Sequence, residues 1–210
     1  MAEDFNNIAR WSSFLAPLKD QELSVLEVGS SAGNSANAFL TLLPKSKITC
    51  VDIWQRTNEA AFDEAMKPFA GRVEKIKGRS VPTLDAMIVE GRQFDIVYVD
   101  GSHTHDDALM DSVLCWQLLK PEGIIIWDDY VWELGNLPIA ERCKEAIDEF
   151  IAMHPIDLRV IERGYQVIGR KVESGGNNAP IAEGFTYSRN LRNFWRFLTQ
   201  QPMHSPHHGS

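Results

Sequence analysis

Two apolar, strand-like stretches of the sequence each end in carboxylates. The first is FDIVYV at 94–99, which is followed by Asp100. The second is GIIIW at 123–127, which is followed by Asp128 and Asp129. Carboxylates that lie close together repel one another, so at least one takes up a proton unless a positive charge compensates them. Mg²⁺ and Ca²⁺ prefer oxygen ligands of this kind, so the strand ends are candidates for a metal site.

The composition is that of a globular protein with a surplus of acids. Of the 210 residues, 44% are hydrophobic and 24% are charged, and the formal net charge is −8. Nucleic-acid binding relies on clustered Lys and Arg, so we expect no nucleic-acid partner. No run of ~18 apolar residues is present to span a bilayer, and the first ten residues lack the layout of a secretory signal. We therefore expect no membrane association.

The three cysteines are far apart, without the paired spacing of a zinc site or a disulfide framework. They are Cys50, Cys115 and Cys143. Free thiols in apolar stretches behave as small hydrophobic groups, which agrees with a reducing, cytoplasmic location.

Strand-like and helix-like stretches alternate through the middle of the chain. The expected strands are 24–30, 47–54, 72–78, 94–100 and 123–129. The expected helices are 34–43, 58–70, 82–90, 106–119 and 139–153, and the helix at 58–70 is interrupted or ended at Pro68. Two last stretches, 158–162 and 165–171, have the pattern of a closing hairpin. Continuous apolar strands between helices are typical of a mostly parallel sheet that is covered on both faces.

The chain divides into three expected parts. Residues 1–20 form an N-terminal helix, residues 21–172 form the main domain, and residues 173–210 hold a linker, an appended helix and a disordered tail. The apolar side of the appended helix needs cover. It docks on its own domain or on a second subunit, and the second arrangement predicts a homodimer.

The turn after the first strand has the features of a ligand-binding turn. Gly29 and Gly33 let a ligand approach the backbone and the N-terminus of the next helix. Asp52, at the end of the second strand, is placed to accept hydrogen bonds from a ribose. The dinucleotide fingerprint needs a middle glycine, and Ser31 stands there instead. A ligand with an adenosine and no pyrophosphate fits better, and S-adenosylmethionine is one; a plain strand–helix turn is the alternative.

Three stretches of the sequence resemble the class I S-adenosylmethionine-dependent methyltransferases: VLEVGSSAGNSA, VDIW and FDIVYVDGSHTHDDALMDSVLCWQLLKPEGIIIWDDYVW. In particular they resemble the small-molecule O-methyltransferases with D-G-S-H and D-D-Y motifs, methyltransferase family 24. The likeness covers roughly residues 22–171. It implies a Rossmann-like, doubly wound α/β fold whose seven-stranded sheet has the order 3-2-1-4-5-7-6, with strand 7 antiparallel.

The resemblance also implies which residues contact S-adenosylmethionine. The methionine part lies at the first turn, the ribose at the end of the second strand, and the adenine near the start of the helix after the third strand. The expected contacts are Glu27, Gly29, Ser30, Gly33, Asp52, Ile53, Trp54, Ser80 and Asp100. Trp54 has a second interpretation, as an aromatic that covers the rim of the sheet.

Strands four and five are neighbours in this fold, so Asp100, Asp128 and Asp129 converge beside the sulfonium of the cofactor. The resemblance implies that these three residues hold Mg²⁺ or another divalent cation. Such a cation lowers the pKa of a substrate hydroxyl and orients it for attack on the methyl group. His103 and Asp100 are then the expected catalytic residues, with His103 as the general base, because an imidazole with a pKa near ~6.5 suits that role.

Simpler interpretations stay open for each of these residues. Asp100 is a strand-end cap that touches only the cofactor, the pair Asp128 and Asp129 caps a turn, and His103 begins a helix without a chemical role. The aromatic residues Trp127, Tyr130 and Trp132 either stack on a flat acceptor or belong to the core and its rim.

The leading functional hypothesis is Mg²⁺-assisted O-methylation of a small hydroxylated molecule. The alternatives are a metal-independent methyltransferase of the same fold and a non-catalytic module that binds S-adenosylmethionine. A nicotinamide dehydrogenase is disfavoured by Ser31, which takes the place of the middle glycine.

Overall fold

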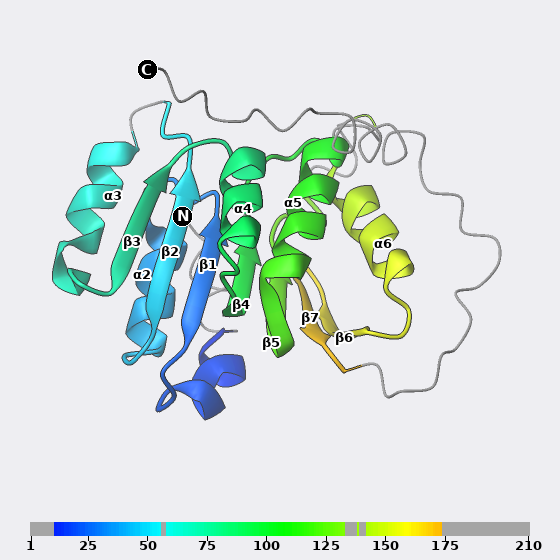
Figure 1. Cartoon of the computed structure of the whole chain (residues 1–210), viewed down its shortest axis with the longest axis horizontal. Helices are drawn as coiled ribbons and strands as arrows, with labels where there is room; N and C mark the ends of the chain where they lie inside the picture. Colours follow the sequence, from blue (N-terminus) through cyan, green and yellow to red (C-terminus); the bar gives the residue numbers. More distant parts are fainter. Residues whose placement is uncertain (1–10, 56–57, 133–137, 139–141, 174–210) are drawn as a thin grey trace, which may run out of the picture. The chain divides into compact units, whose positions relative to one another are not determined.

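The structure is a computed structural model that describes residues 11–55, 58–132, 138 and 142–173. These residues build one twisted sheet with helices on both faces. Figure 1 shows α4 and α5 in front of the sheet and α2 behind it. The linker, appended helix and tail expected at 173–210 lie outside the described residues except for Glu173, so the homodimer stays a prediction.

The sheet has seven strands in the order β3-β2-β1-β4-β5-β7-β6. Strand β7 is antiparallel to both of its neighbours, and the other pairs are parallel. This confirms the predicted fold class, strand order and closing hairpin. The strands are β1 Ser24–Val28, β2 Lys47–Asp52, β3 Val73–Lys77, β4 Phe94–Val99, β5 Leu119–Trp127, β6 Leu158–Arg163 and β7 Val167–Lys171.

The described helices follow the predicted alternation, with shifted ends. They are η1 Ala16–Leu18, α2 Asn34–Leu42, α3 Glu59–Met66, η2 Lys67–Phe69, α4 Ser80–Val89, α5 His105–Leu118 and α6 Cys143–Met153, and residues 11–15 are also helical. The helix predicted for 58–70, interrupted or ended at Pro68, is confirmed, because α3 ends at Met66 and η2 covers Lys67–Phe69. Pro68 has no N–H and disfavours a helical conformation before it, so the α-helix gives way to a 3₁₀ turn.

Strand β5 begins earlier than the sequence predicts. Leu119 already pairs with Phe94, and the register then shifts before Ile124 pairs with Ile96. Glu122 in this shift has a φ of +63°. The sequence LKPEG at 119–123 does not have the pattern of a strand, because Pro and Gly mark turns. In the structure these residues form the irregular start of β5.

The core explains why the central strands are continuously apolar. Val25 and Leu26 of β1 and Ile96 and Val97 of β4 are all fully buried, because helices cover both faces of the sheet. The N-terminal segment joins this core through Trp11, which is 2% exposed. All three cysteines are free thiols, as the sequence predicts, and all three are buried, whereas the sequence placed only two of them in apolar stretches.

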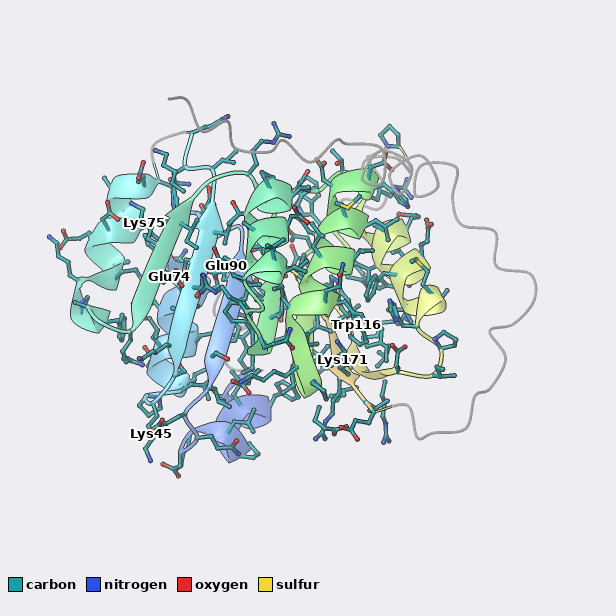
Figure 2. All side chains as sticks on the ribbon, viewed as in Figure 1. Lys45, Glu74, Lys75, Glu90, Trp116 and Lys171 are labelled. Atoms are coloured by element: carbon teal, nitrogen blue, oxygen red, sulfur yellow. The ribbon has the colours of Figure 1, made fainter. Side chains whose placement is uncertain are left out.

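The antiparallel strand β7 is fixed to helix α5 by Lys171. Its Nζ donates hydrogen bonds to the carbonyl oxygens of Trp116 and Leu119 at 2.8 and 2.9 Å, and it lies 4.9 Å from the ring centroid of Trp116. Figure 2 labels Lys171 and Trp116 side by side. The contact lies at the start of β5, at the end of this strand opposite to Asp128.

None of the helices in the described part of the chain combines the length and the apolar character needed to cross a bilayer.

Because the ends of β1 and β4 approach closely, a methyl group added at Gly29 should lower the stability of the fold strongly. At Gly29, which has a φ of +92°, a Cβ atom would lie 1.8 Å from the carbonyl oxygen of Asp100. Gly71 has a similar φ of +88°, with no described atom within 4 Å of its Cβ position. Gly71→Ala should therefore lower the free energy of unfolding by only ~1–2 kcal/mol, which is the cost of a left-handed backbone conformation for a residue other than glycine. Gly29→Ala should lower it by more, because the strand ends must separate; equal losses in urea unfolding would contradict this.

Candidate functional site

Acidic residues lie side by side at the carboxyl ends of β4 and β5. The backbone N–H of Asp100 donates to the carbonyl oxygen of Val28 at 2.8 Å, and that of Asp128 donates to Val99 at 3.0 Å. These bonds extend the parallel pairing of β1, β4 and β5 by one residue. The predicted convergence of the two strand ends is therefore present.

A cavity opens beside the turn from β1 to α2. Gly33 begins this helix with a φ of +85°, and its N–H donates to the carbonyl oxygen of Ser30 at 2.7 Å. The buried hydroxyl of Ser30 makes no hydrogen bond of ordinary geometry among the described residues. The cavity is lined by Trp11, Gly29, Ser30, Ser31, Ala32, Asn34, Ser35, Ala38, Tyr98, Asp100 and Asp128.

Glu27 lies beneath this turn and does not line the cavity. Its carboxyl group is fully buried, and burial raises its pKa. One oxygen accepts a hydrogen bond from the hydroxyl of Ser35, and the other accepts one from Sγ of Cys50 at 3.4 Å. Glu27 thus ties the first turn of α2 to β2, and it supports the turn that the sequence assigns to the methionine part of a cofactor.

Asp52 connects the two loops at the end of β2. Its Oδ2 accepts the N–H of Ser31 at 2.8 Å, and its Oδ1 accepts the N–H of Trp54 at 2.7 Å. Ser31 and Trp54 both have positive φ values, +45° and +38°. A carboxylate has about four lone-pair sites, so the two backbone bonds leave acceptor capacity for the hydroxyls of a ribose.

Trp54 and Ile53 have opposite environments. The indole of Trp54 is 5% exposed, packs 4.8 Å from the ring centroid of Phe62 and donates to the carbonyl oxygen of Ser31 at 2.8 Å. Lys75, labelled in Figure 2, lies 5.0 Å from the indole centroid. Ile53 is 45% exposed, so it is the residue beside Asp52 whose apolar surface is open to a ligand.

Ser80 begins α4 and is hydrogen-bonded to Asp111 of α5. Asp111 is 1% exposed, and burial raises its pKa to about 6, although the bond from Ser80 acts in the opposite direction. Ser80 therefore holds α4 against α5 next to Gly101, whose added Cβ would lie 2.9 Å from Oδ2 of Asp111.

The acidic cluster brings together Asp100, His103 and Asp129. Ligand atoms from these three side chains all lie within 4.8 Å of one another, a spacing that can hold a metal ion. Nε2 of His103 is 2.9 Å from Oδ2 of Asp129. The predicted metal ligands included Asp128 and not His103, so the structure places an imidazole where the sequence placed only carboxylates.

Asp128 adjoins this group with both oxygens engaged by donors. Oδ2 accepts the hydroxyl of Tyr98, and Oδ1 accepts the N–H of Asp129 at 2.9 Å and the amide of Gln166 at 3.1 Å. The donors fix the orientation of the carboxylate, and they leave fewer lone pairs for a cation.

The pKa shifts follow from burial and mutual repulsion. Burial, followed by the charges of Asp128 and Asp129, raises the pKa of Asp100 well above its usual range. Burial also raises the pKa of Asp128. Burial acts to raise the pKa of Asp129, but hydrogen bonds from His103 and Tyr165 outweigh it and lower that pKa. The same contact with Asp129 raises the pKa of His103.

Several residues of the site have no signal of their own in the sequence. Tyr98 precedes Asp100 by two positions, so strand alternation puts both on one face. Gln166 lies next to Asp128 because Trp127 pairs with Val167 across the antiparallel ladder. The tyrosine could have been found from alternation, whereas the glutamine requires the register of the hairpin.

The aromatic residues after β5 divide between the core and the site. Trp127 and Tyr130 are 1% and 5% exposed, and their polar atoms bond to Ser112 and Asp148 at 2.9 Å. They belong to the core. The ring of Trp132 lies 4.6 Å from that of His103, centroid to centroid, so Trp132 is the aromatic that adjoins the acidic cluster.

Comparison with known sequences places the chain among methyltransferases. A family model described as a methyltransferase domain matches residues 26–130. Caffeoyl-CoA O-methyltransferase 1 of Eucalyptus globulus is 31% identical over 115 residues, which are 52% of this chain and 45% of that protein. O-methyltransferase hkm8 of Aspergillus hancockii is 30% identical over 108 residues, 50% of this chain and 42% of that protein. The matches span less than half the length of these relatives.

Comparison of structures gives the same fold. The MycE methyltransferase of the mycinamycin biosynthetic pathway, in complex with Mg, SAH and mycinamycin VI, matches with a TM-score of 0.63 and 17% identity over 82% of this chain and 51% of that chain. SAH-bound PaMTH1 of Podospora anserina matches with a TM-score of 0.64 and 22% identity over 80% of this chain and 78% of that chain.

The contact between His103 and Asp129 predicts a pH-dependent stability. The folded pKa of His103 is raised, so the contact stabilises the fold fully below the unfolded pKa of about 6.5 and loses this effect as the pH rises through the folded value. The difference in melting temperature between the wild type and His103→Gln should therefore be larger at about pH 6 than at about pH 9. A difference that is the same at both values would contradict the ion pair.

Proposed function

Because the chain belongs to the methyltransferase domain family that its residues 26–130 match, we propose that it transfers a methyl group from S-adenosylmethionine to a hydroxyl of a small molecule, assisted by Mg²⁺ or another divalent cation. The family membership agrees with the resemblance found in the sequence. The single observation that carries the proposal is the convergence of Asp100, His103 and Asp129 next to the cavity at the first turn.

The residues around the cavity suit S-adenosylmethionine. Gly29 leaves the backbone open beside Asp100. The buried hydroxyl of Ser30 lies at the cavity wall beside the carboxyl group of Glu27. Asp52 keeps acceptor capacity for the ribose hydroxyls, and the exposed side chain of Ile53 suits the face of an adenine ring. In this proposal the adenosine lies across the end of β2 and the methionine part enters the cavity.

The donor set of the acidic cluster suits a hard divalent cation. Asp100 and Asp129 supply carboxylate oxygens, and Asp128 supplies a lone pair that its donors leave free. Burial, followed by the charges of Asp128 and Asp129, raises the pKa of Asp100, and a bound positive charge would favour its ionised form. When bound, the cation lowers the pKa of the acceptor hydroxyl and holds it in place.

His103 takes the proton of the acceptor hydroxyl at Nδ1, because Nε2 carries the hydrogen that it donates to Asp129. The hydroxyl oxygen forms a bond to the methyl carbon while the bond from that carbon to sulfur breaks, and S-adenosylhomocysteine leaves. Two contacts orient the imidazole: Oδ2 of Asp129 at 2.9 Å and the ring of Trp132 at 4.6 Å. His103 is 39% exposed, so the proton can pass on to solvent.

The names of the relatives support the reaction class and the cation. Two curated relatives are named as O-methyltransferases, and the MycE structure is described with Mg and SAH. The acceptor is proposed as a small hydroxylated molecule. The absence of nucleic-acid partners and the cytoplasmic location stay predictions from the net charge of −8 and the cysteine pattern.

A metal-independent transfer is the second candidate, and one observation favours it. His103 and Asp129 form a hydrogen-bonded pair with Nε2 and Oδ2 2.9 Å apart. A carboxylate that orients an imidazole is sufficient for general base catalysis. This candidate and the first differ in their response to chelation.

The cofactor proposal predicts selective stabilisation. S-adenosylhomocysteine at ~100 times its dissociation constant should stabilise the fold by ~2.7 kcal/mol and raise the melting temperature, whereas NAD should not. Asp52→Asn should weaken the shift, because it removes a charged acceptor for the ribose. Asp63→Asn changes the same charge at an exposed site on α3 and should leave the shift unchanged. Equal shifts with both ligands would contradict the assignment.

The cation proposal predicts loss of turnover in EDTA and recovery with Mg²⁺. Asp100→Asn and Asp129→Asn should abolish turnover and leave S-adenosylhomocysteine binding largely intact, as measured by calorimetry, because the proposed methionine and ribose contacts lie at the ends of β1 and β2. Asp95→Asn, a matched change at the opposite end of β4, should keep the cation response. His103→Ala should lower the rate by ~10²–10⁴-fold, with a smaller loss at high pH. Full turnover after metal stripping would select the metal-independent candidate.

A further inference from the structure

A chain of buried hydrogen bonds leads from the N-terminal segment to Asp128. The indole N–H of Trp11 donates to Oε1 of Gln166 at 2.8 Å, and Nε2 of Gln166 donates to Oδ1 of Asp128 at 3.1 Å. Trp11 and Gln166 are 2% and 1% exposed. Residues separated by more than 150 positions in sequence are thus connected inside the core.

The direction of this chain is fixed by chemistry. An indole nitrogen can only donate, whereas a glutamine amide has one accepting and one donating end. The accepting end of Gln166 must therefore face Trp11, and the donating end must face Asp128. A reversed amide would set two donors against each other and two acceptors against each other, which leaves buried polar atoms unsatisfied.

Trp11 also contacts the second donor to Asp128. Its ring stacks on Phe39 with centroids 4.4 Å apart, and it meets Tyr98 edge-on at 5.2 Å. Tyr98 in turn donates its hydroxyl to Oδ2 of Asp128. Both oxygens of Asp128 are therefore held by side chains that touch Trp11, and the backbone N–H of Asp129 adds a further donor.

We propose that Trp11 and Gln166 are positioning residues that hold the carboxylate of Asp128 for cation binding. The N-terminal segment is then a working part of the site, and Trp11 also forms a wall of the cofactor cavity. This inference rests on the proposed function. Residues that orient a metal ligand commonly change metal affinity by about 10–100-fold when they are replaced.

The test is calorimetric titration of the full chain with Mg²⁺ and, in parallel, Mn²⁺. Trp11→Phe keeps an aromatic ring and removes the N–H, and Gln166→Leu removes both ends of the amide at similar size. Each should weaken cation binding by about 10-fold or more. The double variant should bind the cation no more weakly than the weaker-binding single variant, because both changes break the same chain of hydrogen bonds.

Ser112→Ala is the matched control. Ser112 accepts the indole N–H of Trp127 at 2.9 Å in the core, so its loss also leaves a buried indole without an acceptor, away from Gln166. It should lower the melting temperature much as Gln166→Leu does and leave cation affinity unchanged. Circular dichroism and thermal unfolding confirm that each variant is folded.

The outcomes separate this inference from the proposed function. A wild type that binds cation, with Trp11→Phe and Gln166→Leu binding it equally well, overturns the inference and leaves the function standing. Additive losses in the double variant, or an equal loss in Ser112→Ala, also overturn it. A wild type that binds neither cation overturns both.

Discussion

Three carboxylates end two neighbouring strands, and their mutual repulsion has to be compensated wherever they are buried. Hydrogen-bond donors surround two of the three carboxylates. Tyr98 and Gln166 donate to Asp128, and His103 and Tyr165 donate to Asp129. Asp100 has less of this support, and its pKa is raised far from its usual range. A low dielectric strengthens each of these contacts and also raises the penalty for any charge left unpaired.

The proposed cofactor side of the site uses a carboxylate in a different way. Asp52 accepts two backbone N–H groups from residues with positive φ, Ser31 and Trp54. These conformations are unfavourable for residues other than glycine, so the carboxylate stabilises the loop geometry as well as offering acceptor sites. The strand end therefore has a structural role that exists before any ligand binds.

The sequence carries enough information to predict the sheet and the strand ends. Continuous apolar stretches between helices specify a covered parallel sheet, and Asp100 and Asp128 follow directly from where β4 and β5 stop. The sequence predicted Asp128 as the third possible metal ligand beside Asp100 and Asp129, whereas the structure places His103 there. This difference could not be predicted, because it depends on side-chain rotamers. Gln166 and Trp11 could not be predicted either, since their contacts depend on the hairpin register and on tertiary packing of a distant segment.

The cofactor cavity and the acidic cluster share walls, because Trp11, Tyr98, Asp100 and Asp128 line the cavity and also make or support the cluster. A change in the packing of Trp11 therefore alters the cavity wall and the acidic cluster together. Interiors are close-packed and respond to such changes by discrete shifts of side chains. In the proposed function, the segment from Trp11 to Leu18 therefore limits the geometry in which a methyl donor and an acceptor oxygen would meet.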